Sequence, residues 1–253
     1  MLHRTCRIIG LVGALVALGA AEAGAEPLTV GLNFVGDQTY SPGGEAVLDA
    51  ADRAGALSQT HWNNAYGGCS SLAGLLDSDG AAMGVSATWR ADTFYLGVAP
   101  LSPDHRLMRG HLAPLGTDPI TVTVSGLDAA ASGPWDVLVY FDVYNSGQHA
   151  SDVAMTFTIG SSVLTGTDRA GEDFDGTFVE DTGAGGNVVR FSGLSGDGFV
   201  LEVSGTGAAV AALQIHHAPE PATLLLVGAG AGACAVVRRR ARSASGGQTS
   251  PRG

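Results

Sequence analysis

Short runs of apolar, β-branched and aromatic residues recur along the chain, and Gly, Asp, Asn and Ser separate them. Ile120–Ser125 alternates apolar with polar residues, as a strand with one buried face does. Trp135–Asp142 is more continuously apolar, which predicts a central strand covered on both faces. We expect further strands at 28–35, 84–90, 94–98, 155–159, 177–180, 188–191 and 199–204. Short strands with regular turn signals favour an all-β sandwich or barrel.

Few helix signals interrupt this pattern. The Ala, Leu and Asp residues over 46–56 predict a short helix, which would lead into the sequence around Trp62. His216 and His217 stand where the β-rich body meets a proline pair. We interpret these two histidines as part of a spacer.

The N-terminus has the pattern of a secretory signal peptide. Arg4 and Arg7 precede an apolar run over 8–21, and small residues follow it. The Ala-Gly-Ala sequence at 23–25 fits the A-x-A pattern that signal peptidase reads, and the Ala-Glu-Ala sequence at 21–23 is an alternative site. We expect cleavage after Ala25, and therefore export.

The C-terminal part combines a proline motif, an apolar run and an arginine cluster. In order, these are Pro219, Glu220 and Pro221, the uncharged range 222–237, and Arg238, Arg239 and Arg240. The proline pair ends the preceding fold because proline lacks an N–H donor and restricts the residue before it. As a helix the apolar run rises about 24 Å, slightly less than a hydrocarbon core of about 30 Å. Arginines behind such a run stay cytoplasmic, which predicts a body outside the membrane.

This tail resembles the PEP-CTERM sorting signal, which exosortase-type membrane proteases process. The resemblance implies that Pro219, Glu220 and Pro221 form the recognition motif and that the arginines form the stop-transfer cluster. The chain departs from the usual pattern in one respect, because Ser243–Gly253 continues beyond the cluster. The alternative interpretation is a plain single-span anchor behind a proline-rich linker.

These features predict four parts of the chain. They are a signal peptide (1–25), a β-sandwich extracytoplasmic domain (26–217), a sorting and anchor segment with one transmembrane helix (218–242), and a cytoplasmic tail (243–253). The body is also similar to other exported PEP-CTERM proteins with all-β bodies, at Leu32–Val35, Trp62–Asn64 and Val137–Asp142. That likeness implies a jelly-roll-like sandwich and brings no catalytic residues.

Composition narrows the classes of partner. The chain has 24 acidic residues, 13 basic residues that are all arginine, and a net charge of −11. Such acidity argues against a nucleic-acid partner. Of the three cysteines, Cys6 belongs to the predicted signal peptide and Cys234 to the apolar run, so Cys69 is alone in the body. A disulfide framework is therefore not expected there.

No familiar catalytic motif appears in the sequence. The serine-hydrolase elbow, the helical His-Glu-x-x-His zinc motif, and the glycine-rich phosphate loops are all missing. We therefore expect a protein that is not an enzyme and has no organic cofactor.

Acidic residues near glycines suggest a calcium site. Asp168, Glu172, Asp173 and Asp175 lie in one short stretch. Calcium takes six to eight oxygen ligands and tolerates irregular loops. Solvated turns account for the same residues, because Asp and Gly dominate turns generally.

The sequence also offers a sugar site. Trp62 lies in a loop-like stretch with Asn63 and Asn64 beside it, and an indole face with amide neighbours suits a sugar ring.

The expected function is that of an exported, exosortase-sorted, non-catalytic surface or extracellular-matrix protein, with extracellular polysaccharide as an expected partner. We expect inner-membrane anchoring first, then a cell-surface or extracellular location after processing. A carbohydrate-binding module is the alternative, and a secreted hydrolase is a third.

Overall fold

Strands dominate the part of the chain that the computed structural model describes, which is residues 28–36, 45–95, 98–130, 133–143 and 151–217. In chain order they are β1 (Thr29–Gly36), β2 (Asn63–Tyr66), β3 (Cys69–Ala73), β4 (Ser86–Arg90), β5 (Asp92–Tyr95), β6 (Gly110–Ala113), β7 (Ile120–Ser125), β8 (Trp135–Tyr140), β9 (Val153–Ile159), β10 (Ser162–Asp168), β11 (Val188–Leu194), β12 (Gly198–Ser204) and β13 (Ala212–His217). Two short helices accompany them, α1 (Pro103–Leu107) and α2 (Leu127–Ala130).

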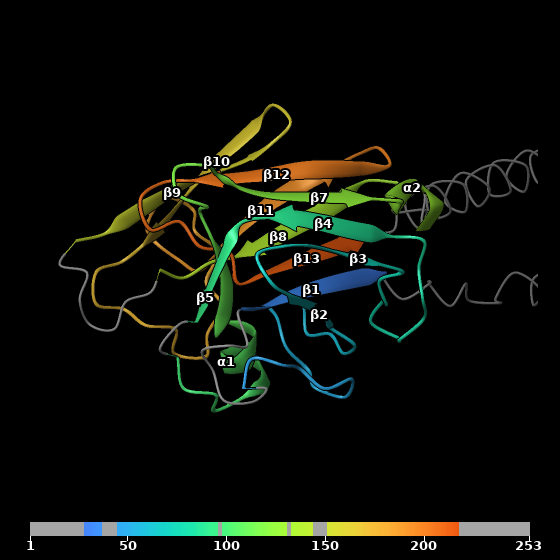
Figure 1. Ribbon diagram of the computed structural model, residues 1–253, viewed down its shortest axis with the longest axis horizontal. Coiled ribbons are helices and arrows are strands. Elements are labelled where there is room, and N and C mark those ends of the chain that lie inside the picture. Colours follow the sequence, from blue (N-terminus) through green and yellow to red (C-terminus); the bar gives the residue numbers. More distant parts are fainter. Residues whose placement is uncertain (1–27, 37–44, 96–97, 131–132, 144–150, 218–253) are drawn as a thin grey trace, which may run out of the picture. The chain divides into compact units, whose positions relative to one another are not determined.

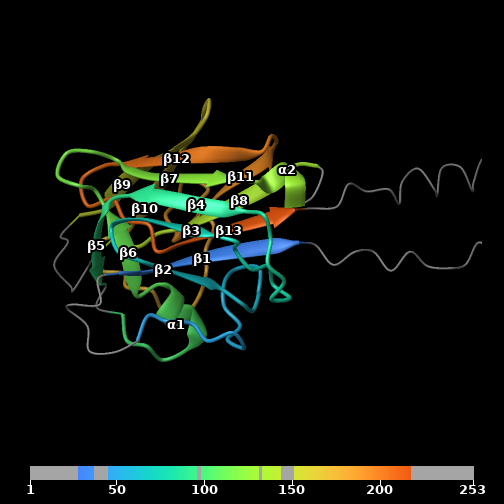
Figure 2. The same ribbon diagram turned by 45° about the vertical axis from the view of Figure 1, so that its right-hand side comes forward.

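The strands form two large sheets and one small one. The five-stranded sheet has the order β11-β8-β13-β1-β2, the six-stranded sheet has the order β10-β9-β12-β7-β4-β3, and β5 pairs with β6 alone. The two large sheets lie face to face in Figures 1 and 2, and α1 lies beyond the five-stranded sheet. All pairings are antiparallel except β1 with β2. The prediction of an all-β, sandwich-like body is confirmed.

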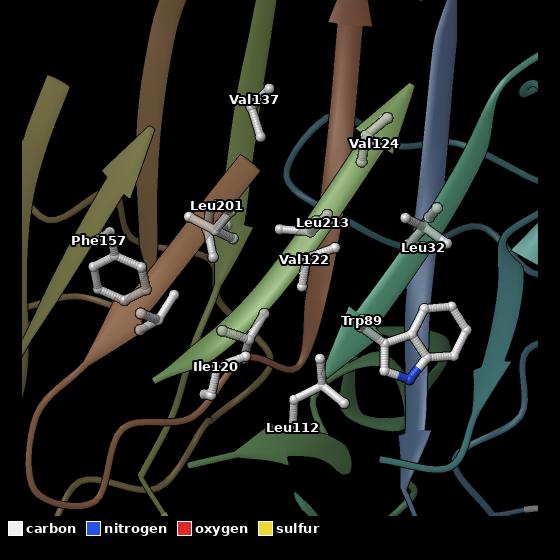
Figure 3. Close-up of a cluster of buried hydrophobic side chains, with 14 of the residues drawn as sticks. Leu32, Trp89, Leu112, Ile120, Val122, Val124, Val137, Phe157, Leu201 and Leu213 are labelled. Carbon is white, nitrogen blue, oxygen red and sulfur yellow. The ribbon is translucent and has the colours of Figure 1, made fainter. Parts of the chain in front are cut away.

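The main hydrophobic core lies between the two large sheets. Figure 3 shows part of it, with Ile120, Val122, Val124, Phe157 and Leu201 from the six-stranded sheet and Leu32, Val137 and Leu213 from the five-stranded sheet. In the six-stranded sheet buried residues alternate with residues that face away from the core, as in β7 and β12. The predicted strand at 120–125 coincides with β7, and its expected single buried face is confirmed.

The five-stranded sheet is buried on its outer face as well. A second apolar cluster there includes Leu138 and Tyr140 of β8, Trp62, and Leu107 of α1. β1 is buried along its whole length. The expectation that Trp135–Asp142 is covered on both faces is therefore confirmed for β8, an inner strand between β11 and β13.

Two local predictions are wrong. The range 46–56 forms turns in place of a helix, because backbone pairing between Ala54 and Gln59 and a contact of Asp52 with the Asp49 amide fold it back. The range 177–180 is no strand, since only Glu180 makes a single bridge, to Val188.

Three of the four predicted parts lie outside the described residues, namely the signal peptide (1–25), the sorting and anchor segment with its apolar run (218–242), and the cytoplasmic tail (243–253). Within the described ranges, no helix is long and apolar enough to cross a membrane.

Candidate functional site

The sorting motif of Pro219, Glu220 and Pro221 lies outside the described residues, as do Arg238, Arg239 and Arg240. The structure does describe the strand that leads to the motif. β13 is the middle strand of the five-stranded sheet, between β8 and β1, and it ends at His217. Because Pro219 follows two residues later, the motif begins almost where the sheet ends.

Both neighbouring strands hold the end of β13. The His217 backbone N–H donates to the Leu28 carbonyl oxygen at 2.9 Å. On the other side His217 lies opposite Trp135, and the two rings contact edge to face with centroids 4.9 Å apart. Trp135 is itself fully buried, so it is a rigid partner. The interpretation of the two histidines as a spacer is wrong, because cross-strand pairing continues to the last residue of β13.

His216 is held in the same way. It lies opposite Thr29 of β1, whose hydroxyl is 3.3 Å from the His216 Nδ1, and opposite Asp136 of β8. Burial lowers the pKa of His216, an effect that Asp136 opposes and Arg190 reinforces. A neutral imidazole therefore fits this part of the sheet.

Trp62, the predicted sugar platform, is a core residue. Its side chain is only 4% exposed, and its ring packs edge to face on Tyr140. The indole N–H donates to the Ala54 carbonyl oxygen at 3.2 Å. Gly31 lies so close under the ring that a Cβ atom there would come within 2.5 Å of it. In this conformation the indole face contacts protein rather than solvent.

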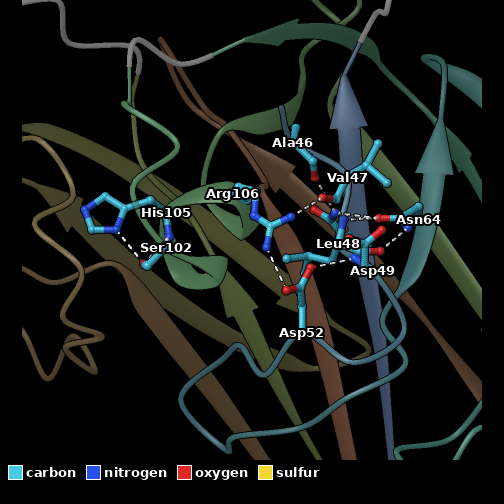
Figure 4. Close-up of polar contacts among 10 residues, drawn as sticks. Ala46, Val47, Leu48, Asp49, Asp52, Asn64, Ser102, His105 and Arg106 are labelled. Carbon is cyan, nitrogen blue, oxygen red and sulfur yellow. Dashed lines mark hydrogen bonds and ion pairs between the residues drawn. The ribbon is translucent and has the colours of Figure 1, made fainter. Parts of the chain in front are cut away.

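Asn63 and Asn64 use their amides to hold neighbouring backbone. The Asn63 amide bonds the Gly31 carbonyl and both backbone groups of Leu76. The Asn64 amide exchanges two bonds with the backbone of Leu48, as Figure 4 shows. The three residues predicted as a sugar site are therefore consecutive and close together, but their polar groups attach loops to the edge of the five-stranded sheet.

The segment over 45–61, which we call the covering segment, packs Leu48 and Ala54 on the outer face of the five-stranded sheet. Figure 4 also shows a second attachment of this segment. Arg106 of α1 donates to the Val47 carbonyl at 3.1 Å and pairs with the Asp52 carboxylate at 2.7 Å. Ser102 caps α1 by accepting from the His105 backbone N–H, and its hydroxyl lies 2.7 Å from the His105 ring. This Ser–His contact is explained by helix capping.

The acidic stretch lies against a cavity of about 730 Å³. Asp168, Glu172, Asp173 and Asp175 all line it, and so does Asp142, which is not among the predicted site residues. Asp168 is buried and accepts from the Val143 backbone N–H at 3.1 Å, whereas Glu172, Asp173 and Asp175 are exposed. The structure thus brings the four predicted residues to one cavity, at different depths.

Asp142 is the most perturbed acid of this cavity. Burial raises its pKa most, the nearby Asp168 and Asp173 carboxylates add to this effect, and a hydrogen bond from the Phe174 backbone opposes it, so that the pKa of Asp142 is about 8. Asp142 follows β8 of the five-stranded sheet, and Asp168 is the last residue of β10 in the six-stranded sheet. An aspartate at the end of an apolar strand was the available sequence signal. In the described ranges, no group of three or more His, Cys, Asp or Glu side chains has the arrangement of a metal site.

The outward face of the six-stranded sheet is rich in hydroxyl groups. We call this surface the hydroxyl face, and its hydroxyl residues are Ser71, Ser86, Thr88, Thr121, Thr123, Ser125, Thr156, Thr158, Thr165, Thr167 and Ser204. They form rows across the strands: Ser71 lies opposite Thr88, Thr88 opposite Thr123, and Thr123 opposite Val200. Neighbouring residues of such a row are about 4.8 Å apart.

Little charge interrupts the hydroxyl face. Arg90 pairs with Asp118 at 2.8 Å, and Glu202 is the other charged residue on the described strands of this face. Val163 and Val200 add exposed methyl groups, at 61% and 45% exposure. The surface is therefore nearly neutral although the whole chain carries a net charge of −11.

The described body is thus an all-β, sandwich-like domain whose middle strand runs directly into a proline motif. Residues 217–240 match the family model of the PEP-CTERM protein-sorting motif. The chain is therefore an exported protein with membrane-anchored sorting through its C-terminal region, and exosortase, a membrane protease, recognises this motif. No curated protein and no solved structure matches the chain.

Proposed function

We propose that this chain is a non-catalytic cell-surface or extracellular-matrix protein whose hydroxyl face contacts neutral extracellular polysaccharide. The observation that carries the proposal is the near-neutral, hydroxyl-rich outer face of the six-stranded sheet. Export by the sorting motif supports it, because the body then meets polymers outside the cell.

The chemistry of this face suits a neutral, hydroxylated polymer. A net hydrogen bond at a wet surface contributes only about 1 kcal/mol, so binding needs many bonds at once. Rows such as Ser71, Thr88 and Thr123 present regularly spaced hydroxyls over neighbouring strands. A polyanionic partner would be repelled by the acidic body, whereas a neutral polymer is not.

Co-sedimentation with insoluble cellulose, chitin and the extracted extracellular matrix of the producing cells tests this proposal. Thr88→Lys and Val200→Lys each place a long charged side chain in the row that Ser71, Thr88, Thr123 and Val200 form across the strands. We expect about tenfold weaker retention of each variant. Ser58→Lys makes the same charge change in an exposed turn on the other side of the sandwich, and it serves as the matched control. Equal retention of all three variants would contradict the proposal.

We further propose the route by which the body reaches the outside. Signal peptidase removes 1–25, the range 222–237 spans the inner membrane as a helix, Arg238–Arg240 stay inside, and exosortase processes the tail. Intact mass and cell fractionation compare the wild type with a Pro219-Glu220-Pro221→Ala variant. Loss of the tail in the wild type alone supports this route, and retention of 222–253 in both identifies a plain anchor.

A carbohydrate-binding module with Trp62, Asn63 and Asn64 at its site is the second proposal. Because the Trp62 indole is buried, a sugar could reach it only if the segment over 45–61 moved away. Unchanged glycan retention by a folded Trp62→Ala variant would end this proposal.

The jelly-roll-like topology remains a prediction. A secreted hydrolase is the third proposal, and a substrate screen of the purified protein tests it.

Calcium at Asp168, Glu172, Asp173 and Asp175 is a further proposal, supported by the shared cavity and by the buried Asp142. A cation would stabilise the ionised carboxylates that repel each other there. We expect CaCl₂ to raise the unfolding temperature more than MgCl₂ does, and Asp168→Asn to remove the difference. Asp197→Asn, an exposed acid away from the cavity, is the control. Equal effects of both salts would count against calcium.

A further inference from the structure

The distance along the chain between the folded sheet and the sorting motif is very short. His217 is the last residue of β13, and only Ala218 separates it from Pro219. Two residues of extended chain reach about 7 Å, which is less than the spacing of about 10 Å between packed sheets. A protease cleft that surrounds the motif with extended chain on its N-terminal side would therefore collide with the sandwich.

The end of β13 is also firmly held. His217 bonds to Leu28 and packs on Trp135, and His216 is paired with residues of both neighbouring strands. Gly133 approaches the His217 ring so closely that a Cβ atom there would lie 2.7 Å from its Nε2. β13 is the middle strand of its sheet and not an edge strand, so release of its end breaks contacts with both β1 and β8.

We infer that exosortase engages this chain only after the last residues of β13, His216 and His217, detach from β1 and β8. The inference rests on the proposed processing of the tail and concerns the binding step before any bond breaks. Local opening of strand ends is common, and proteolysis follows the population of the open form when opening is fast. Trp135 and Thr29 are then positioning residues, because they set how often the motif becomes accessible.

A cross-strand disulfide tests the inference directly. Thr29 and His216 are opposite residues with side-chain atoms 3.3 Å apart, so Thr29→Cys with His216→Cys suits a disulfide that closes the end of β13. The variants are made in the full chain with Cys69→Ser, which removes the free thiol of the described body. Processing is followed in the producing cells by the mass of the chain over time.

We expect the disulfide to slow processing at least about tenfold and a reductant to restore it. Insertion of Gly-Ser-Gly-Ser between Ala218 and Pro219 adds about 13 Å of chain, and it should restore processing while the disulfide stays closed. This insertion separates a spatial block from a misfolded body. In the wild-type background the same insertion should speed processing.

Ser86→Cys with Ser125→Cys is the matched control. These residues are also opposite one another in an antiparallel pair, with hydroxyl oxygens 2.9 Å apart, but they lie in the six-stranded sheet. We expect normal processing of this variant. Normal processing of the chain while the disulfide between positions 29 and 216 is closed would overturn the inference and leave the sorting proposal intact. If no variant, including the wild type, loses its tail, the processing proposal fails and the inference fails with it.

Discussion

The inner strands β1, β8 and β13 of the five-stranded sheet are mostly buried on both faces, whereas the six-stranded sheet has one face in solvent. On the outer side of the first sheet, loops and α1 cover Leu138 and Tyr140 with a second apolar cluster. On the outer side of the second sheet, Thr and Ser residues alternate with the buried apolar ones. The two sheets share one core between them but meet different surroundings outside it.

This difference separates stability from function. The covered face is fixed by buried amides and a buried tryptophan, so changes there act mainly on folding. The open face has no comparable packing, and its Thr and Ser residues contribute little to stability. A surface with such freedom is where a binding role is most easily tested.

Trp62→Ala should give the largest loss of stability. It empties a buried indole volume beside Tyr140 and removes the hydrogen bond to Ala54, so we expect about 3–5 kcal/mol less unfolding free energy. Urea unfolding followed by fluorescence measures it. A loss below about 1 kcal/mol would mean that the covering segment adds little to the fold.

The pH dependence of stability should come next in size, at the cavity edge of the covered sheet. The pKa of Asp142 is about 8 in the folded protein and 3.8 in the unfolded chain. The unfolded state therefore releases this proton first, and stability falls as pH rises from about 4 to about 8, by on the order of a few kcal/mol. Asp142→Asn should flatten this slope in urea unfolding with EDTA at pH 5 and pH 8. An unchanged slope would assign the dependence to other groups.

Asn63→Ala should destabilise by about 1–3 kcal/mol, because it leaves the buried Gly31 carbonyl and the part-buried backbone groups of Leu76 without their side-chain partner. Thermal unfolding compares it with Asn187→Ala, whose amide bonds exposed loop backbone. A smaller effect at Asn63 than at Asn187 would contradict the structural role of the Trp62–Asn64 stretch.

Thr88→Ala and Asp118→Asn should have the smallest effects, each within about 0.5 kcal/mol. Thr88 is exposed on the hydroxyl face, and the Arg90–Asp118 pair is about half exposed. The same unfolding experiment measures both. A loss above about 1 kcal/mol at Thr88 would show that the open face is a structural surface, which would weaken its proposed binding role.

Several strands could be predicted because their side chains carry the period of a half-buried strand. Ile120–Ser125 coincides with β7, and the apolar Trp135–Tyr140 is β8, a covered inner strand. β13 escaped prediction because Ala212 is a weak strand former and Gln214 is polar. Its burial depends on partners far away in the chain, among them Tyr140, which bonds Gln214.

The candidate site residues divide in the same way. Asp168, Glu172, Asp173 and Asp175 are neighbours in sequence, so their common location follows from chain connectivity. Asp142 joins them only because β8 and β10 end beside each other in space, which no local pattern records. The polar residues next to Trp62 predict a loop. In the structure, however, Asn63 and Asn64 use their polar side chains to bond the backbone of Gly31 and Leu48.

By itself, the sequence determined that this protein is exported and sorted through a PEP-CTERM motif, and that its body consists of short strands. These properties depend on contiguous residues: a proline motif with its tail, and side chains that alternate along a strand. The tertiary structure alone decided which sheet face is covered, where Trp62 points, and that β13 continues to the edge of the motif. The physical reason is that burial and pairing depend on residues distant in the chain, whereas a local pattern specifies only which side chains favour being buried.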